Sequence, residues 1–330
     1  MTSKWDILLS KFRDLGGIAD NICQKEGTNG RGIFPVNSKI KSKIFTPSNL
    51  IIKKEDIYLL DGKVRIKDKD YYHRDTREFF DFYQDNFSWG GGGKEITETF
   101  ENSLKLFPSN LKGILKDNRL IDIEERHKGI WKNVILSQFL YAREFNFKNQ
   151  SQIVPLLELV NHNAISFQFY KSNSGISSPN YPPLSRELTY SYGNKGTLSC
   201  LFNYGFFSKE TIVFSLPFNL FIKEMDITLM CQGNELRDDS MKIQRSGKNI
   251  LIEGLPIADS NSPSLPESYF KELIDQIGGC RFLINPLIEI INFNKVIREN
   301  ILISIESTHN NASLMLENAI NHEIELISHF

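Results

Sequence analysis

Two short stretches of this chain carry the polar and aromatic side chains best suited to chemistry. The first follows the apolar run 154–160, which ends abruptly in Asn161, His162 and Asn163. Amide and imidazole groups are costly to bury unless their donors and acceptors are used, so their position at the end of an apolar run is informative. No second histidine stands at metal-ligand spacing from His162. Hydrogen bonding therefore fits this pair better than metal chemistry, and taken alone such a pair is most often structural.

The second stretch spans 192–206 and carries the aromatic groups. It opens with Tyr192-Gly193 and closes with Tyr204, Gly205 and Phe206. A tyrosine has an apolar body and one hydroxyl, so a buried tyrosine with a satisfied hydroxyl is a common structural element. A hydroxyl at a ligand site is the functional alternative.

Two earlier motifs have the same double interpretation. The segment 27–35 is rich in glycine, which permits positive φ and close approach to the backbone, although a simple turn is the plainer interpretation. It fails the dinucleotide fingerprint, because Pro35 stands where a third glycine is needed. Arg143, in Arg143-Glu144-Phe145, would most often be a solvated charge near a helix C-terminus.

In combination these motifs resemble the SET-domain methyltransferases. The subgroup most similar is typified by the Rubisco large-subunit lysine methyltransferase, in which a helical insertion splits the SET domain and a helical substrate-binding domain follows. The motifs occur here in the family's order: Gly-x-Gly at 30–32, Arg-x-Phe at 143–145, Asn-His at 161–162, Tyr-Gly at 192–193 and Tyr-Gly-Phe at 204–206. Each motif is weak alone, and the ordered set is fairly specific.

The resemblance implies a cofactor, S-adenosyl-L-methionine, and a set of residues to hold it. Backbone near the first motif would cradle its methionyl end, Arg143 would hold its carboxylate, and Asn161 with His162 would bind its amine and the adenine side. The implied cofactor-binding residues are Gly30, Arg31, Gly32, Arg143, Asn161, His162, Tyr204 and Phe206. No metal site is implied.

The resemblance also implies a catalytic residue, Tyr204, with Tyr192 as a supporting ring. The expected activity is S-adenosylmethionine-dependent methylation of a lysine side chain in a protein substrate. Lysine must lose a proton before it attacks, because the pKa of an unperturbed lysine side chain is about 10.4. Protein-histidine methylation and a catalytically weak SET-like binding module remain alternatives. Two departures keep the last one open: Glu158 stands where the family has aspartate, and Gly196-Thr197 where it has Ser-Asn.

The composition, with 40% hydrophobic and 24% charged residues, is ordinary for a soluble globular protein. The 330 residues carry 39 basic and 40 acidic side chains without a long run of one sign, so no nucleic-acid surface is expected. No apolar run approaches the roughly 20 residues of a membrane span, and no signal peptide is evident. The four cysteines form no Cys-x-x-Cys pair, which favours a cytoplasmic or other reducing compartment. The sequence does not indicate an oligomeric state.

The predicted fold class is α+β. Residues 1–207 are expected to form a β-rich SET core with a helical insertion at about 71–145, and 208–330 a mostly helical C-terminal domain for substrate binding. Within this plan the apolar spacing predicts a short N-terminal helix, a clear helix over 122–145 and helices from 267 to the end. The glycine run 90–93 is expected to form a flexible loop.

Overall fold

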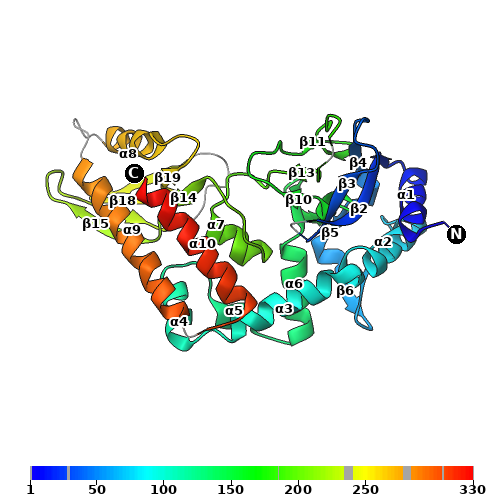
Figure 1. Ribbon diagram of the computed structural model, residues 1–330, viewed down its shortest axis with the longest axis horizontal. Helices are drawn as coiled ribbons and strands as arrows, with labels where there is room; N and C mark the ends of the chain where they lie inside the picture. The colour runs from blue at the N-terminus through cyan, green and yellow to red at the C-terminus, as the bar shows by residue number, and fades with distance from the viewer. Residues whose placement is uncertain are drawn as a thin grey trace. The chain divides into compact units, whose positions relative to one another are not determined.

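The chain forms two compact units, each built from two separate stretches of sequence. The computed structural model describes residues 2–27, 30–184, 186–233, 241–277, 284–306 and 308–329 (Figure 1). The first unit comprises Met1–Thr99 and Gly129–Tyr192, and the second comprises Phe100–Lys128 and Gly193–Phe330. Both units contain helices and strands, so the predicted α+β class is confirmed.

The first unit holds several small sheets. Its strands are β1 (Ile18–Asp20), β2 (Ile22–Gly27), β3 (Gly30–Pro35), β4 (Lys43–Pro47), β5 (Ile52–Lys53), β6 (Ile57–Leu60), β7 (Lys63–Ile66), β8 (Glu144–Phe147), β9 (Gln150–Ile153), β10 (Asn161–His162), β11 (Tyr170–Ser172), β12 (Gly175–Ser177) and β13 (Thr189–Tyr190). They pair in the orders β1-β4-β12-β11 and β5-β9-β8, as the hairpins β2-β3 and β6-β7, and as β10-β13. Of these pairs, β10-β13 is parallel. The apolar run 154–160 therefore delivers Asn161 and His162 into a strand.

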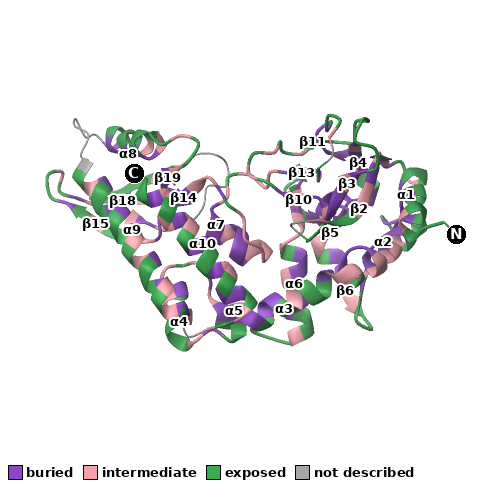
Figure 2. Ribbon diagram, in the orientation of Figure 1, coloured by how far each residue is buried: buried purple, intermediate pink, exposed green. Residues whose placement is uncertain are grey.

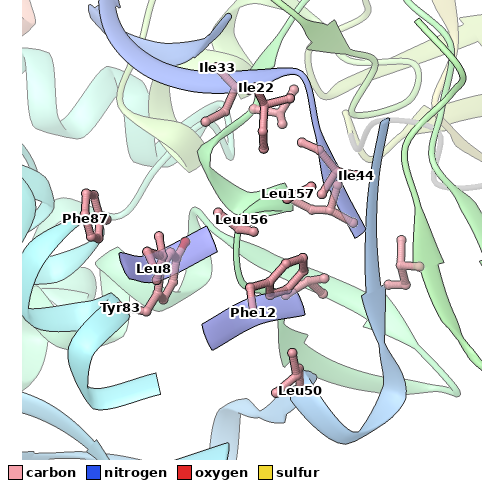
Figure 3. Close-up of a cluster of buried hydrophobic side chains, with 14 of the residues drawn as sticks. Leu8, Phe12, Ile22, Ile33, Ile44, Leu50, Tyr83, Phe87, Leu156 and Leu157 are labelled. Atoms are coloured by element: carbon pink, nitrogen blue, oxygen red, sulfur yellow. The ribbon is translucent and has the colours of Figure 1, made fainter. Parts of the chain in front are cut away.

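Helices and strands of the first unit share one apolar core. Helix α1 (Lys4–Asp14) begins after Ser3, whose hydroxyl accepts a hydrogen bond from the Asp6 amide at 3.1 Å. The predicted N-terminal helix is thus present. Figure 3 shows its Leu8 and Phe12 in a cluster with side chains from β2, β3, β4, α2 (Arg74–Asn86) and the segment before β10. This packing fixes the backbone that leads into Asn161.

The helices between residues 71 and 145 differ from the prediction in two places. They are α2, the π-helical turn η3 (Trp89–Gly93), α3 (Lys94–Lys105), α4 (Ser109–Asp117), α5 (Ile123–Arg126) and α6 (Trp131–Tyr141). The predicted helix over 122–145 is wrong as one element, because Gly129 at φ +112° separates α5 from α6. Its last residues belong to β8. The expected loop at 90–93 is also wrong, since these glycines lie in η3.

The second unit combines strands with long helices. Its strands are β14 (Ile212–Phe214), β15 (Phe218–Ile222), β16 (Ile227–Cys231), β17 (Lys242–Ser246), β18 (Asn249–Glu253) and β19 (Pro256–Asp259). Its remaining helices are α7 (Thr197–Ser199), the π-helical turn η5 (Cys200–Tyr204), α8 (Leu265–Gln276), α9 (Ile284–Ile305) and α10 (Asn311–Ser328). Figure 2 shows buried positions recurring along α10 between exposed ones, as the amphipathic pattern predicts.

The predicted domain boundary after residue 207 stays a prediction. The two compact units divide the chain after Tyr192, and residues 100–128 of the predicted insertion belong to the second unit. Cys23 and Cys231 carry free thiols, whereas Cys280 lies outside the described residues. Among the described residues, no helix is both long and apolar enough to cross a membrane.

Candidate functional site

Asn161 joins three segments of the first unit. Its strand β10 lies parallel to β13, with Asn161 opposite Thr189 and His162 opposite Tyr190. The amide Nδ2 of Asn161 donates to the Arg31 carbonyl at 3.1 Å and to Glu187 Oε1 at 2.6 Å. Both amide hydrogens are therefore committed, and what Asn161 can offer a ligand is its carbonyl Oδ1, an acceptor.

This junction depends on Gly32 having no side chain. A Cβ built at Gly32 would lie 1.9 Å from Glu187 Oε1 and 2.9 Å from Asn161 Nδ2. Real Cβ atoms do not approach other heavy atoms so closely, so Gly32 admits the Asn161–Glu187 hydrogen bond by leaving space for it. At Gly32 the atoms that come close to the backbone are side chains of the chain itself, and the approach of a ligand to these glycines stays a prediction.

Gly30 and Arg31 contribute differently. Gly30 has φ +80° with open space where a Cβ would stand, so its backbone conformation, rather than crowding, favours glycine. The Arg31 side chain leaves the strand toward the η3 glycines, where its Nη1 lies 2.8 Å from a Cβ built at Gly91. Its Nε also lies 3.5 Å from the exposed carboxylate of Glu26. Of Arg31, the backbone carbonyl is the part that contacts Asn161.

His162 is held in one orientation by Tyr192. The imidazole is buried, and its Nδ1 accepts a hydrogen bond from the Tyr192 amide at 3.0 Å. Nδ1 therefore carries no proton in this arrangement, and a neutral ring has its proton on Nε2. The two rings also lie against each other, with centroids 4.7 Å apart. The structure thus brings together two residues that the motifs name separately.

A series of aromatic rings connects these residues with the Arg-x-Phe motif. Phe145 lies 5.6 Å from Phe169, Phe169 lies 3.8 Å from Tyr190, and Tyr190 lies 4.7 Å from Tyr192, measured between ring centroids. Offset and tilted ring pairs of this kind add to the energy of burial. The Arg-x-Phe and Tyr-Gly motifs, which lie far apart in sequence, are therefore joined by ring contacts within the first unit.

Arg143 has donors to spare for a ligand. It follows helix α6 and is half-buried, with its guanidinium carbon 4.2 Å from the centre of the Phe139 ring. Among the described residues its side chain makes one hydrogen bond, from Nη1 to the Phe139 carbonyl at 3.3 Å. A guanidinium offers five N–H donors, so most of those of Arg143 remain for an anion.

The buried carboxyl group of Glu158 interacts electrostatically with Arg143. Its Oε1 accepts from the Tyr83 hydroxyl at 2.7 Å and from the Ser88 hydroxyl at 2.6 Å. Its Oε2 is buried without a hydrogen-bond partner among the described residues. Burial raises the pKa of the Glu158 carboxyl, against the opposing effects of Arg143, of the two hydroxyl donors and of the Gln84 amide.

The remaining predicted residues, Tyr204 and Phe206, lie in the second unit. Tyr204 ends the helical segment formed by α7 and η5, and Gly205 follows it at φ +74°, a left-handed conformation that commonly ends a helix. The Tyr204 and Phe206 rings have their centroids 6.0 Å apart. The predicted site residues thus divide between the units, with Gly30, Arg31, Gly32, Arg143, Asn161, His162 and Tyr192 in the first.

Several residues of the first-unit arrangement were not predicted. They are Tyr83, Ser88, Phe169, Glu187 and Tyr190. The alternation over 187–192 predicts a strand, and it could have placed Tyr190 with Tyr192 on one face. The roles of Tyr83 and Ser88 had no local signal, because their partner Glu158 lies far along the chain.

The chemistry of these donors and acceptors fits the methionyl end of S-adenosylmethionine. An ammonium group needs acceptors, which Asn161 Oδ1 provides, and a carboxylate needs donors, which Arg143 provides. Both residues belong to the first unit, so one compact unit supplies both kinds of contact.

Comparison with known proteins yields structural likeness only. No family model matches the chain, and no curated protein matches it significantly. A solved structure described as the SET domain of LSMT bound to lysine and AdoHcy is 12% identical with a TM-score of 0.49, covering 99% of this chain and 89% of that chain. Structures of Rubisco LSMT bound to AdoMet, and to sinefungin and monomethyllysine, have TM-scores of 0.45 and identities of 12% and 13%. They cover 100% of this chain and 91% and 90% of those chains. At such identities the roles of single residues do not transfer.

Gly32→Ala should disrupt the Asn161 junction. The added methyl group must displace the end of the Glu187 side chain, which breaks its hydrogen bond with Asn161 and should cost roughly 0.5–1.5 kcal/mol of stability. Urea unfolding of the purified protein measures the loss. Gly113→Ala is the matched control, because a Cβ there meets nothing within 4 Å and lies within helix α4. Equal stability of the two variants would contradict the crowding at Gly32.

Glu158→Gln should change how stability depends on pH. The folded state raises the pKa of Glu158, so it favours the protonated carboxyl. The stabilisation from this preference is complete below the unfolded pKa of about 4.3 and is lost as pH rises through the folded pKa. We therefore expect the wild-type protein to lose stability relative to Glu158→Gln as the pH rises above the unfolded pKa of about 4.3. Glu95→Gln is the control, because Glu95 is exposed, and its free energy of unfolding should depend on pH as that of wild type does.

Proposed function

We propose that this protein is an S-adenosylmethionine-dependent methyltransferase that modifies a lysine side chain of a protein substrate. The observation that carries the proposal is that Arg143, with spare donors, and Asn161, with a spare acceptor, belong to the same compact unit, and each offers the group that its SET-like motif implies. Oriented ring contacts from Phe145 to His162 support it, since they join three of the five motifs.

The cofactor would be held chiefly by the first unit. Arg143 would bind the carboxylate of the methionyl group, and Asn161 Oδ1 would accept from its ammonium. His162 and the backbone at Gly30 and Gly32 would line the site. When bound, S-adenosylmethionine supplies an activated methyl group with a neutral leaving group.

The residues of the chain would align the acceptor and manage its proton. A tyrosine hydroxyl accepts a hydrogen bond from an amine and donates one, so it can orient a lysine nitrogen. Tyr204 is proposed for this role, with Tyr192 as a supporting ring. Alignment of reacting atoms alone accounts for several kcal/mol of barrier lowering in well-organised sites, about 7–11 at most. Exclusion of water would keep the amine unprotonated more readily than bulk solvent does.

A second candidate, a catalytically weak SET-like binding module, is favoured by one specific observation. At both positions where the sequence departs from the family pattern, a buried polar atom has no hydrogen-bond partner among the described residues. These atoms are Glu158 Oε2 and Thr197 Oγ1. Unsatisfied buried groups destabilise the fold around them, and they mark places where the pattern has changed without full compensation.

Arg143→Ala should weaken binding of S-adenosylhomocysteine without unfolding the protein. Loss of a hydrogen bond to a charged group costs about 1.5–3 kcal/mol, which is roughly tenfold to more than a hundredfold in Kd. Titration calorimetry measures it. Lys132→Ala serves as the control, because Lys132 is exposed on the preceding helix α6. If the wild-type protein is folded and binds neither this ligand nor S-adenosylmethionine at millimolar concentration, the proposal fails.

Tyr204→Phe separates an enzyme from a binding module. The change keeps the ring and removes the hydroxyl, so stability should fall by only about 0.5–1.5 kcal/mol. Turnover should fall at least about tenfold, equal to about 1.4 kcal/mol of barrier. The assay is transfer of tritium from labelled S-adenosylmethionine into lysate protein, with the labelled residue type identified afterwards.

Tyr192→Phe is the comparison variant and should lose less. Label on lysine supports the proposal, and label on histidine would support protein-histidine methylation. A wild-type protein that binds the cofactor and labels nothing would support the binding module. Full activity of Tyr204→Phe would remove Tyr204 from the catalytic role.

A further inference from the structure

The helical segment that carries Tyr204 is short and consists of two kinds of turn. It runs from α7 into η5, so that Thr197–Ser199 is α-helical and Cys200–Tyr204 is a π turn. Such π turns are uncommon and are frequent at functional sites. A helix of this length has little stability of its own, because the first and last turns leave their backbone groups unsatisfied. Something outside the segment must therefore hold it.

The partly buried guanidinium of Arg126 contacts the C-terminal end of the segment. Arg126 Nη1 donates to the Phe202 carbonyl at 2.8 Å, next to the carbonyl of Leu201, which accepts from the Gly205 amide at 2.9 Å. The rest of the Arg126 fork grips Glu101, with Nε to Oε2 at 2.9 Å and Nη2 to Oε1 at 2.6 Å. Bidentate pairs of this kind fix orientation as well as distance.

The carboxylate of this pair is ionised and buried. Glu101 is 1% exposed, and its Oε2 also lies 2.8 Å from His127 Nε2. Burial alone would raise the pKa of Glu101, but hydrogen bonds from His127 and Arg126 hold the pKa below its usual value. A lone buried charge is unstable, so each partner depends on the other.

A second buried ion pair contacts the N-terminal end. Glu323 Oε1 accepts from the Leu198 amide at 3.2 Å, one of the amides that a helix beginning at Thr197 leaves open. Its Oε2 lies 2.7 Å from Arg298 Nη2, and both side chains are almost fully buried. Arg298 in turn donates to the Phe214 carbonyl at 3.1 Å. The anchor therefore extends to strand β14.

The signs of the two contacts match the helix dipole. A carboxylate at the N-terminus and a guanidinium at the C-terminus are the arrangement that the partial charges of the backbone favour at each end. One comes from α10, near the end of the chain, and the other from α5, early in the chain. Two distant stretches thus hold the same short segment, 197–204.

We propose that the ion pairs Arg126–Glu101 and Arg298–Glu323 are a two-ended clamp that positions Tyr204, and that Arg126 and Glu323 are positioning residues for the reaction. This inference rests on the proposed function for its catalytic part, and on the contacts alone for its mechanical part. The part of residues 100–128 that includes Glu101 and Arg126 would then serve catalysis without touching the cofactor or the substrate.

Arg126→Lys tests the mechanical part without any assay of activity. Lysine keeps the positive charge and cannot make three directed contacts at once, so the segment should loosen. Hydrogen–deuterium exchange of peptides covering 197–207 in the full chain should become faster, while peptides from β2 and β3 stay unchanged. Lys128→Ala is the matched control, because Lys128 is exposed and makes only a surface pair with Glu125.

If Arg126→Lys does not fold, Glu101→Asp replaces it, since aspartate keeps the charge and shortens the reach by one methylene. Unchanged exchange of 197–207 in a folded variant of either kind would overturn the clamp.

The catalytic part is tested by combining variants. Arg126→Lys should lower the initial rate of tritium transfer into lysate protein by about tenfold to a hundredfold, the scale expected for a misplaced group. Its affinity for S-adenosylhomocysteine should stay within about twofold of wild type, because the polar contacts proposed for the amino-acid end of the ligand, from Arg143 and Asn161, lie in the first unit.

The double variant Arg126→Lys/Tyr204→Phe should be no slower than Tyr204→Phe, because Arg126 acts through that hydroxyl. A double variant about tenfold slower than Tyr204→Phe would overturn the positioning role. If Tyr204→Phe itself keeps full activity, the proposed function of Tyr204 fails, and the exchange measurement still decides whether the clamp exists.

Discussion

The close approach of three chain segments at Gly32 is the constraint on which the first-unit site depends. The Asn161 amide has two hydrogens and uses both to bind β3 and the segment before β13. This leaves Oδ1 as the one polar atom of that side chain available to a ligand, and it sets the register that places His162 beside Tyr192. A Cβ at position 32 would collide with the Glu187 carboxylate and crowd Asn161 Nδ2, so it would disturb the hydrogen bond between these two side chains. The Asn161 side chain therefore has a structural role through Nδ2 and still offers Oδ1 for binding.

Buried carboxylates are stabilised in two ways in this protein. Glu101 and Glu323 each form an ion pair with an arginine. One member of each pair, Arg126 or Glu323, contacts an end of the helical segment that carries Tyr204. Glu158 faces hydroxyl groups, with Arg143 acting on it without an ion pair. The paired acids suit permanent structure, because removing one partner leaves an uncompensated charge. Glu158 favours its protonated form instead, because burial raises the pKa of its carboxyl.

The sequence predicted elements with a strong local pattern and missed those decided by distant contacts. The N-terminal helix and the C-terminal helices follow from the apolar spacing within each segment. The prediction of one helix over 122–145 was wrong because the apolar spacing continues on both sides of Gly129, whereas the helical backbone is interrupted there. The glycines at 90–93 lie in the turn η3, which is interrupted at Gly92, where φ is +108°, a conformation that favours glycine. Asn161 could be singled out by its place after an apolar run, whereas its partner Glu187 could not, since nothing nearby in the sequence marks it.

The division of both units between separate stretches of chain has a consequence for synthesis. Leu111 and Leu115 of α4 belong to the same buried cluster as Leu316 and Ile320 of α10. The ribosome synthesises α4 long before α10. The apolar side chains of α4 therefore stay exposed, or bound by a chaperone, until α10 has emerged. Contacts so distant in sequence also slow folding. A protein shortened from its C-terminus would lose more than its last helices, because the early helices would never find their partners.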